Sequence, residues 1–310
     1  MSRTRLALAL LGLAAVAACA RSTVNPAPVV GAGQAAVDEL LATDRAFSAA
    51  SARTDLISGL SAMFAADVTM PIPGGQFAEG AVKAADALRE ANPDNAQSRV
   101  TWTPVRGGVS ADGLHGFTFG YSKLSAPDGT STPGKYLAYW VKQPAGWRVT
   151  AYRRTRRPTG DVSLALMPAA VPAQIVPAFM DSAAIARFRE SLDSAERTFS
   201  HDAQTIGLGP AFVRYGRADA INLGGTNDTS IVVGAAAIGR LVSEGEPATG
   251  SSVAWSPDRV IVASSGDLGV TIGFIRPNAP PAAGTPATRF AFFTIWDRAS
   301  ASDPWRYIAE

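Results

Sequence analysis

The sequence is poor in the residues that form disulfides and most metal sites. It contains one cysteine, Cys19, and two histidines, His115 and His201, in 310 residues. A single thiol cannot close a disulfide within the chain, so stability must come from packing. Two distant histidines and one cysteine also fall short of the clustered ligands that a zinc site requires. The sequence therefore predicts a protein without a metal and without a cofactor.

Long hydrophobic runs are also missing, apart from one near the beginning of the chain. Arg3 and Arg5 precede an apolar run over residues 6–18, which has the length and flanks of an export signal but is too short for a permanent membrane span. The run ends in Val16-Ala17-Ala18-Cys19, which resembles the bacterial lipobox. An ordinary signal peptide whose cleavage site happens to precede a cysteine is the alternative.

The lipobox resemblance implies that residues 1–18 are removed and that Cys19 becomes the lipid-modified N-terminus of an envelope lipoprotein. Ala20 follows it in place of an aspartate, which favours the outer membrane, facing the periplasm. Residues 19–34 contain proline and glycine without periodicity and are expected to form a flexible tether. The membrane is then contacted only through the lipid anchor.

Net charge is low as well. The formal charge is +2, and the balance is zero once Arg3 and Arg5 are removed. We therefore expect no nucleic-acid partner. Split at Gly160, the mature halves carry +4 and −4, and opposite signs favour docking of one half on the other. One basic cluster, residues 153–157, is interpreted as a solvated strand end that faces the acidic second half, rather than as a site for a membrane or nucleic acid.

A long repeat organises the rest of the chain. Phrases of the first half recur 152 to 158 residues later and in the same order, which indicates two copies of one domain. The anchors are Asp44-Arg45-Ala46-Phe47-Ser48 with Glu196-Arg197-Thr198-Phe199-Ser200, Asp67 with Asp219, Gly80 with Gly234, Trp102 with Trp255, Gly120 with Gly273, Trp140 with Trp296, and Trp147-Arg148 with Trp305-Arg306. We assign residues 35–158 to the first copy, 159–178 to a Pro-rich linker and 179–310 to the second copy.

Each copy changes from helical to alternating periodicity along its length. In the first copy the spacing predicts helices from Ala35 through Phe47, from Leu56 to Asp67 and from Gly80 to Glu90, with an irregular loop over 71–75. Strand-like segments follow near 100–104, 116–124, 136–142 and 148–153. Helices followed by a strand meander predict an α+β fold, with helices packed on a curved, mainly antiparallel sheet.

The first copy resembles the nuclear transport factor 2-like superfamily. The resemblance rests on the helix with the acid-Arg-x-Phe motif, the segment 63–68, the helix led by Gly80, Gly120-Tyr121 and Gly146-Trp147-Arg148. Within this superfamily, these features resemble the branch of unknown function related to SnoaL-like polyketide cyclases and ketosteroid isomerases. The resemblance implies two cone-shaped domains, each with a pocket at its open end. Isomerases of this superfamily use a carboxylate as the catalytic base. The resemblance places that position near Ile72 in the first copy and near Leu223-Gly224 in the second, and neither copy has a carboxylate there. Isomerase chemistry by that route is therefore not expected.

The pocket candidates are polar and aromatic side chains of the two copies. Each aromatic is also a reasonable core residue, and Asp44 is either a pocket acid or a structural group that bonds a Trp or Tyr across the sheet. The candidates are Asp44, Phe47, Trp102, Tyr121, Tyr136, Trp140 and Tyr152 in the first copy, and Glu196, Phe199, Asn222, Trp255, Phe274 and Trp296 in the second.

Three functions stay open at this stage. The first is binding of a small apolar or amphipathic molecule, with the fused copies acting as an intramolecular pseudo-dimer. The second is an enzyme of the cyclase, isomerase or hydrolase kind that uses Asp44 or Glu196 as a base, which would require burial to raise a carboxyl pKa. The third is a structural module in which both pockets are filled by their own aromatics.

Overall fold

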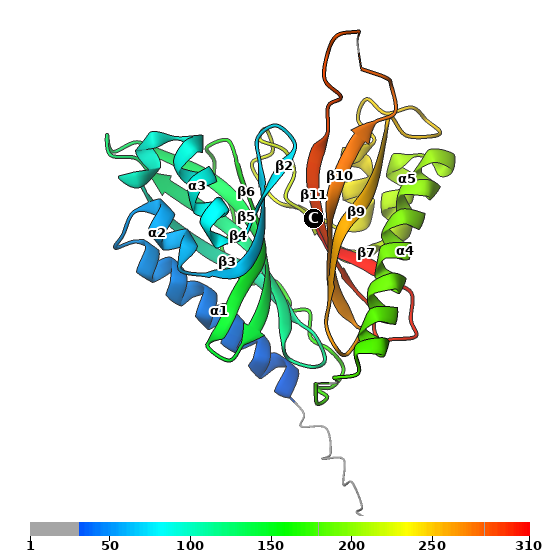
Figure 1. Cartoon of the computed structure of the whole chain (residues 1–310), viewed down its shortest axis with the longest axis horizontal. Helices are drawn as coiled ribbons and strands as arrows, with labels where there is room; N and C mark the ends of the chain where they lie inside the picture. The colour runs from blue at the N-terminus through cyan, green and yellow to red at the C-terminus, as the bar shows by residue number, and fades with distance from the viewer. Residues whose placement is uncertain (1–30, 179, 282) are drawn as a thin grey trace, which may run out of the picture.

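The computed structural model describes residues 31–178, 180–281 and 283–310 (Figure 1). The export signal, Cys19 and most of the expected tether lie outside the described residues. In the described part of the chain, no helix combines the length and the apolar character needed to cross a bilayer.

The first half begins with helices and continues with strands. The long helix α1 buries Val37, Leu40, Leu41 and Asp44, which recur at the spacing of one helix face. Its elements are α1 (Ala32–Ser51), α2 (Leu56–Ser61), β1 (Phe64–Ile72), β2 (Gln76–Glu79), α3 (Ala81–Ala91), the short 3-10 helix η1 (Pro93–Ala96), β3 (Arg99–Val109), β4 (His115–Ser125), β5 (Ser131–Gln143) and β6 (Gly146–Arg156).

The second half repeats this plan with shorter pieces. Its elements are α4 (Ser182–Ile206), α5 (Leu208–Tyr215), β7 (Gly216–Asn222), β8 (Val232–Val233), α6 (Ala235–Val242), β9 (Val253–Val262), β10 (Leu268–Pro277), β11 (Phe290–Asp297) and β12 (Arg306–Ala309). Gly80 and Gly234 hold the same place before α3 and α6, with φ of 93° and 95°, a region that glycine adopts readily.

Two local predictions in the first half are wrong. The second helix ends at Ser61, and residues from Phe64 onward form β1, because Val68 and Thr69 belong to a strand that pairs in parallel with β6. The segment 71–75 is not an irregular loop either. Pro71 and Ile72 finish β1, and a turn at Gly74 and Gly75, both with positive φ, leads straight into the antiparallel partner β2.

Both halves form a six-stranded sheet with the same order. The orders are β2-β1-β6-β5-β4-β3 and β8-β7-β12-β11-β10-β9. Among the described strands of the two sheets, the pairs β1 with β6 and β7 with β12 are parallel and the other pairs are antiparallel. The predicted fold class, two tandem α+β units with mainly antiparallel sheets, is confirmed.

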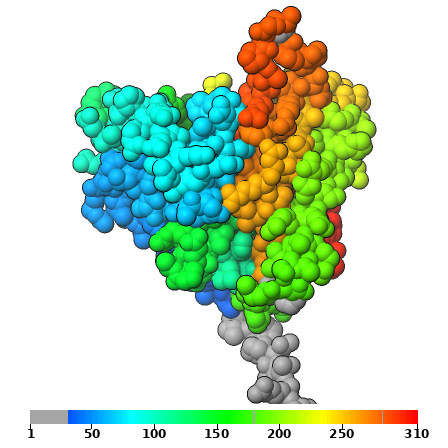
Figure 2. Space-filling view, in the orientation of Figure 1, coloured from blue at the N-terminus to red at the C-terminus, as the bar shows by residue number. Residues whose placement is uncertain are grey.

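The two sheets face each other, and the helices lie on the outer sides (Figure 1). A shared core joins them, in which Phe117, Leu137 and Tyr139 of the first half pack with Ile272 and Phe293 of the second. The space-filling view shows the two halves in continuous contact along this face (Figure 2).

Equivalent residues make reciprocal contacts across this interface. Arg106 bonds the carbonyl and the carboxylate of Asp219, and Arg259 bonds the same two groups of Asp67. Both pairs are related by the repeat, since Arg259 lies 153 residues after Arg106 and Asp219 lies 152 after Asp67. The contact therefore has the self-complementary form of a two-fold dimer interface.

The linker also packs on the first half. Met167 N donates to Val105 O at 2.8 Å and Ala170 N donates to Gly107 O at 3.0 Å, so residues 167–170 run beside β3. Leu164 and Leu166 remain exposed. The connection is thereby held against the sheet rather than free in solvent.

Candidate functional site

The repeated acid of the first helix is fully buried in both copies. Asp44 accepts hydrogen bonds from Trp102 Nε1 at 2.5 Å and from the Tyr136 hydroxyl at 2.7 Å. Burial raises the pKa of the Asp44 carboxyl, while the hydrogen bonds from Tyr136 and Trp102 oppose that rise. Of the two roles considered for Asp44, its geometry is that of a structural acceptor for two aromatic donors.

Glu196 plays the same part with a different set of donors. It accepts from Trp255 Nε1 at 2.6 Å, from Trp296 Nε1 at 2.8 Å and from Thr271 Oγ1 at 2.5 Å. Glutamate is one methylene longer than aspartate, so this carboxyl reaches the second Trp, whereas Trp140 in the first copy bonds Thr118 at 2.8 Å. Burial also raises the pKa of Glu196.

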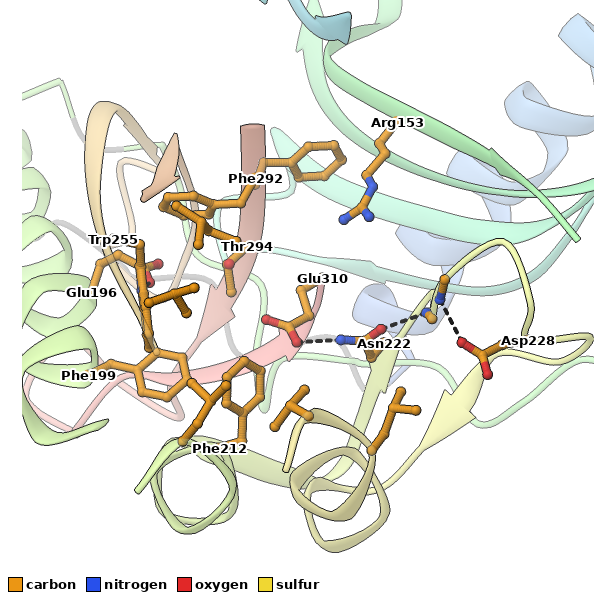
Figure 3. Close-up of a pocket in the computed structure, with 18 residues that line it drawn as sticks. Arg153, Glu196, Phe199, Phe212, Asn222, Asp228, Trp255, Phe292, Thr294 and Glu310 are labelled. Atoms are coloured by element: carbon orange, nitrogen blue, oxygen red, sulfur yellow. Dashed lines mark hydrogen bonds between the residues drawn. The ribbon is translucent and has the colours of Figure 1, made fainter. Parts of the chain in front are cut away.

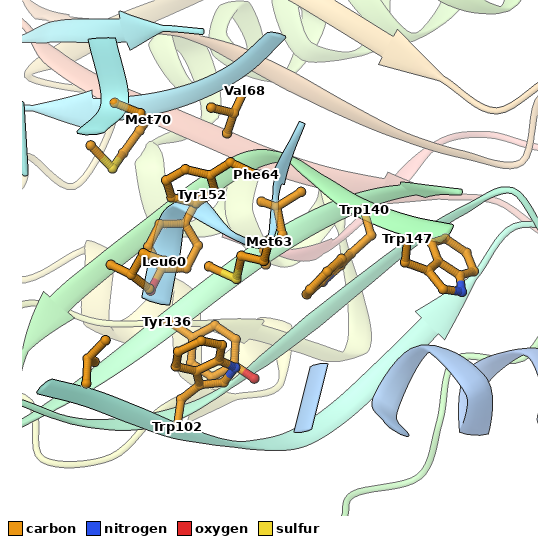
Figure 4. Close-up of a cluster of buried hydrophobic side chains, with 14 of the residues drawn as sticks. Leu60, Met63, Phe64, Val68, Met70, Trp102, Tyr136, Trp140, Trp147 and Tyr152 are labelled. Atoms are coloured by element: carbon orange, nitrogen blue, oxygen red, sulfur yellow. The ribbon is translucent and has the colours of Figure 1, made fainter. Parts of the chain in front are cut away.

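In the first copy the predicted pocket aromatics form a packed core (Figure 4). Trp102, Tyr136, Trp140 and Tyr152 are each at most 6% exposed, and Phe47 packs against them. The short helix η1 lies over this end of the copy, where buried Asn95 donates to Leu88 O at 2.6 Å. These side chains occupy the interior in which the resemblance implied a pocket.

The second copy holds a cavity at the corresponding place. Its volume is about 370 Å³, within the range of small-molecule sites. Most of its wall is apolar; Glu310 and Asn222 are hydrogen-bonded to each other on one side, and Glu196 lies beside Trp255 on another (Figure 3). The lining includes Phe199, Leu208, Phe212, Leu241, Val253, Trp255, Ile275, Phe292 and Phe293, together with Arg153, Glu196, Asn222, Asp228, Thr294 and Glu310.

Strand register identifies what changed between the copies. Val149 and Ala151 pair with Phe64 and Thr69, and Tyr307 and Ala309 pair with Gly216 and Ile221 in the same pattern. Ala309 therefore corresponds to Ala151, and the next residue, Glu310, corresponds to Tyr152. By the same register Asn222 corresponds to Met70. Two large core residues of the first copy are thus replaced by two smaller polar residues in the second.

Glu310 is a second acid of the cavity with a raised pKa. Its Oε1 accepts a hydrogen bond from Asn222 Nδ2 at 2.6 Å, and its backbone pairs with Ile221 and Leu223. Burial raises the pKa of Glu310 to about 8, with nearby Glu196 adding to the rise and Asn222 and Arg153 opposing it. Near neutral pH this carboxyl is largely protonated and can donate a hydrogen bond as well as accept one.

The first copy contributes to the cavity of the second. Arg153 on β6 reaches across the interface into the lining (Figure 3). Lys135 on β5 donates to Gly225 O and, at 2.6 Å, to Asp228 O, and so holds the loop that forms one wall. The strand end does face the acidic second copy at Arg153, as interpreted from the sequence, but Arg153 is partly enclosed by that copy rather than fully solvated.

Some pocket candidates of the second copy line the cavity and others lie elsewhere. Glu196, Phe199, Asn222 and Trp255 line the cavity. Trp296 lies in the core behind Glu196, and Phe274 is on the opposite face of the sheet, with its ring centroid 4.8 Å from that of Phe77. Tyr121, the counterpart of Phe274, also faces the other copy, where its hydroxyl accepts from Ile231 N at 3.2 Å.

Several lining residues were not among the sequence candidates, notably Glu310, Arg153 and Asp228. For Glu310 the sequence did contain a signal, because the repeat makes Glu310 the equivalent of Tyr152, which was a candidate. For Arg153 the sequence offers no signal, because its place depends on how the halves dock. Among the described residues no group of three His, Cys, Asp or Glu side chains is arranged to hold a metal ion.

No family model and no curated protein sequence matches the chain. Solved structures similar to it include a domain of unknown function with a cystatin-like fold from Nostoc punctiforme, with 16% identity, a TM-score of 0.32 and coverage of 38% of this chain and 77% of that one. An NTF2-like protein from Novosphingobium aromaticivorans has 18% identity, a TM-score of 0.30 and coverage of 41% and 84%. A putative dehydratase from the NTF2-like family of Streptomyces avermitilis has 16% identity, a TM-score of 0.31 and coverage of 41% and 99%.

Each of these structures spans about the length of one copy. The name NTF2-like, which recurs among them, is that of the superfamily indicated by the sequence resemblance. At TM-scores near 0.3 and identities below 20%, these likenesses carry no inference about activity or ligand.

Proposed function

We propose that this protein is a binding protein of the bacterial cell envelope, in which the second copy takes up one small apolar or amphipathic molecule. The observation that carries the proposal is the cavity of about 370 Å³, whose mainly aromatic and aliphatic walls include a few polar groups such as Glu310, Asn222 and Thr294. An apolar body gains free energy by leaving water for such walls, while a few polar groups fix its orientation.

The first copy acts in this proposal as a scaffold. Its interior is filled by its own aromatics, and its outer face supplies half of the shared core between the sheets. The reciprocal contacts of Arg106 and Arg259 support the idea that the fused copies take the place of a two-chain dimer. A solution measurement of mass is then expected to give a monomer.

Native mass spectrometry tests the binding function directly. Residues 31–310, isolated gently from the natural host, are expected to carry one extra small-molecule mass that is lost on denaturation. Leu241→Trp is the matched control, because Leu241 lines the cavity and is partly exposed, so the larger indole fills the space from the side of α6. A wild-type chain without any added mass, together with no uptake of apolar probes, would contradict the proposal.

An enzyme is the second candidate, and Glu310 is the observation that favours it. A carboxyl with a pKa of about 8 inside a cavity is suited to general acid or base chemistry. Asp44 and Glu196 suit it less, since each already accepts hydrogen bonds from buried donors. Turnover that is lost in Glu310→Gln, with ligand binding retained, would favour this candidate over simple binding.

The envelope location rests on the residues around Cys19. We propose that Cys19 carries the lipid and anchors the described domains to the outer membrane, on its periplasmic side. Metabolic labelling with a fatty acid is expected to mark the wild-type protein in its host and not Cys19→Ser. Equal labelling of both forms, or none of either, would contradict a lipid anchor at this residue.

A further inference from the structure

One cationic side chain in the cavity, Arg153, makes no ion pair in the described part of the chain, and the acid whose charge acts on it is Glu310. Arg153 lines the cavity of the second copy although it belongs to the first, and no hydrogen bond or ion pair of its guanidinium is found among the described residues. The other interface arginines differ in this respect. Arg106 is paired with Asp219 and Arg259 with Asp67. Arg153 thus offers several unused N–H donors toward the cavity.

The acids of the cavity do not neutralise Arg153. The carboxyl of Glu196 is occupied by two Trp donors and a Thr hydroxyl, and burial favours its neutral form. Glu310 is bonded to Asn222, and burial likewise favours its neutral form near neutral pH. Asp228 accepts from Gly225 N at 2.6 Å and has Lys135 of the first copy as its nearby cation. The net electrostatic demand of the cavity is therefore for a negative charge near Arg153.

The walls determine the rest of the ligand. Phe199, Phe212 and Trp255 line the part of the cavity away from Arg153, with Phe292 also in the wall (Figure 3). Aromatic walls favour a flat ring or an extended hydrocarbon body. Arginine is the side chain best suited to bind a carboxylate or a similar oxyanion through paired N–H groups.

We propose that the ligand is an organic anion, an apolar body with one acidic headgroup, and that Arg153 of the first copy binds this headgroup within the cavity of the second. The site is then composite, since one copy supplies the walls and the other supplies the charge. This inference rests on the proposed binding function and adds the chemical class of the ligand and the residue that selects it.

Two fluorescent probes distinguish binding in the apolar cavity from recognition of the anionic headgroup by Arg153. Anilinonaphthalene sulfonate and N-phenylnaphthylamine share the phenylaminonaphthalene frame and differ in the sulfonate, so they report the apolar walls with and without the anion. Both are expected to bind the wild-type protein at one site. Arg153→Gln is expected to weaken binding of the sulfonate by about tenfold to a hundredfold, the usual range for a lost charge-assisted hydrogen bond, and to leave the neutral probe unchanged.

Arg154→Gln is the matched control. It removes the same charge from the next position of β6, on the opposite face of the strand, and is expected to change neither affinity. Unchanged binding of the neutral probe to Arg153→Gln also shows that this variant is folded. Equal affinity of the sulfonate for wild type and Arg153→Gln would overturn the role of Arg153 and leave the binding function standing. Failure of both probes to bind the wild-type protein would overturn the binding function itself.

Discussion

The two copies share one strand order and one buried acid, yet one interior is packed and the other is hollow. The difference lies in a few positions that register makes equivalent. Tyr152 and Met70 belong to the core of the first copy, and Glu310 and Asn222 replace them in the second, where they are hydrogen-bonded to each other at the cavity. Replacement of large side chains by smaller ones leaves space unless the surroundings collapse. A duplicated fold can thus divide its work, with one copy kept as scaffold and the other opened for binding.

The buried acid is what the copies have in common, and its removal is expected to have the largest effect. Asp44→Ala leaves Trp102 Nε1 and the Tyr136 hydroxyl without an acceptor, and Glu196→Ala does the same to three donors. Each variant is expected to lower the free energy of unfolding by about 4 kcal/mol. Denaturant unfolding measures this, and a loss below about 1 kcal/mol in both variants would contradict a structural role.

Exchanging the equivalent residues Tyr152 and Glu310 tests whether the two copies differ at this position. Tyr152→Glu places a carboxyl in a filled core and is expected to destabilise the chain by about 3 kcal/mol. Glu310→Tyr puts a ring into the cavity and is expected to abolish probe binding at little cost in stability. Equal loss of stability in the two variants, measured by thermal unfolding, would mean that the copies do not differ as described.

The raised pKa of Glu310 gives the second copy a pH dependence that the first copy lacks at the equivalent Tyr152. As the pH rises through about 8, Glu310 ionises beside Arg153 and competes with a bound anion. The affinity for anilinonaphthalene sulfonate is expected to fall by about tenfold between pH 7 and pH 9. Glu196, Asn222 and Asp228 also line the cavity, and Lys135 of the first copy lies near Asp228.

Glu310→Gln is expected to remove most of this dependence, whereas the neutral probe should show none in either form. The same group affects folding. Its folded pKa lies above the ordinary value of 4.5, so the native state holds the proton more tightly and the free energy of unfolding decreases as the pH rises from about 4.5 to about 8. A wild-type affinity for the sulfonate that is constant across this range would show that Glu310 does not titrate near the ligand.

The reciprocal arginines of the interface are expected to differ from each other, and the Arg259 pair gives the smallest effect. The Arg106 side chain is 2% exposed and that of Arg259 is 34% exposed, although both bond the carbonyl and carboxylate of the equivalent aspartate, and Arg259 also bonds Thr69 Oγ1. Arg106→Ala is expected to cost about 2 kcal/mol and Arg259→Ala less than about 1 kcal/mol, because solvent screens the second pair. Chemical denaturation of both variants measures the free energy of unfolding that each one loses. A larger loss in Arg259→Ala than in Arg106→Ala would contradict the expectation that the more buried pair contributes more.

The repeat allowed much of the fold to be predicted, because Trp, Gly and acid-Arg-x-Phe anchors recur at a nearly constant offset and locate both α+β units. Strand β1 was missed because Phe64-Ala65-Ala66-Asp67 is compatible with a helix, and only its pairing with β6, distant in sequence, decides the outcome. Local propensity is often overridden in this way.

The cavity was harder to predict than the fold. Glu196, Phe199 and Trp255 were found because they are counterparts of the first-copy candidates Asp44, Phe47 and Trp102. Glu310 needed the strand register, and Arg153 needed the docking of one sheet on the other, which no local pattern encodes. Its neighbours in the cluster, from Arg154 to Arg157, give no sign that Arg153 alone lines the cavity.

The most direct test of the account is to fill the same place in each copy and measure binding of N-phenylnaphthylamine. Ala87 on α3 and Leu241 on α6 lie seven residues after the equivalent glycines Gly80 and Gly234, and both are partly buried. The account predicts one probe per wild-type chain, no binding to Leu241→Trp and unchanged binding to Ala87→Trp. Loss of binding in Ala87→Trp with retention in Leu241→Trp, or two probes bound per chain, would contradict the claim that the interior of the second copy is open and that of the first is filled.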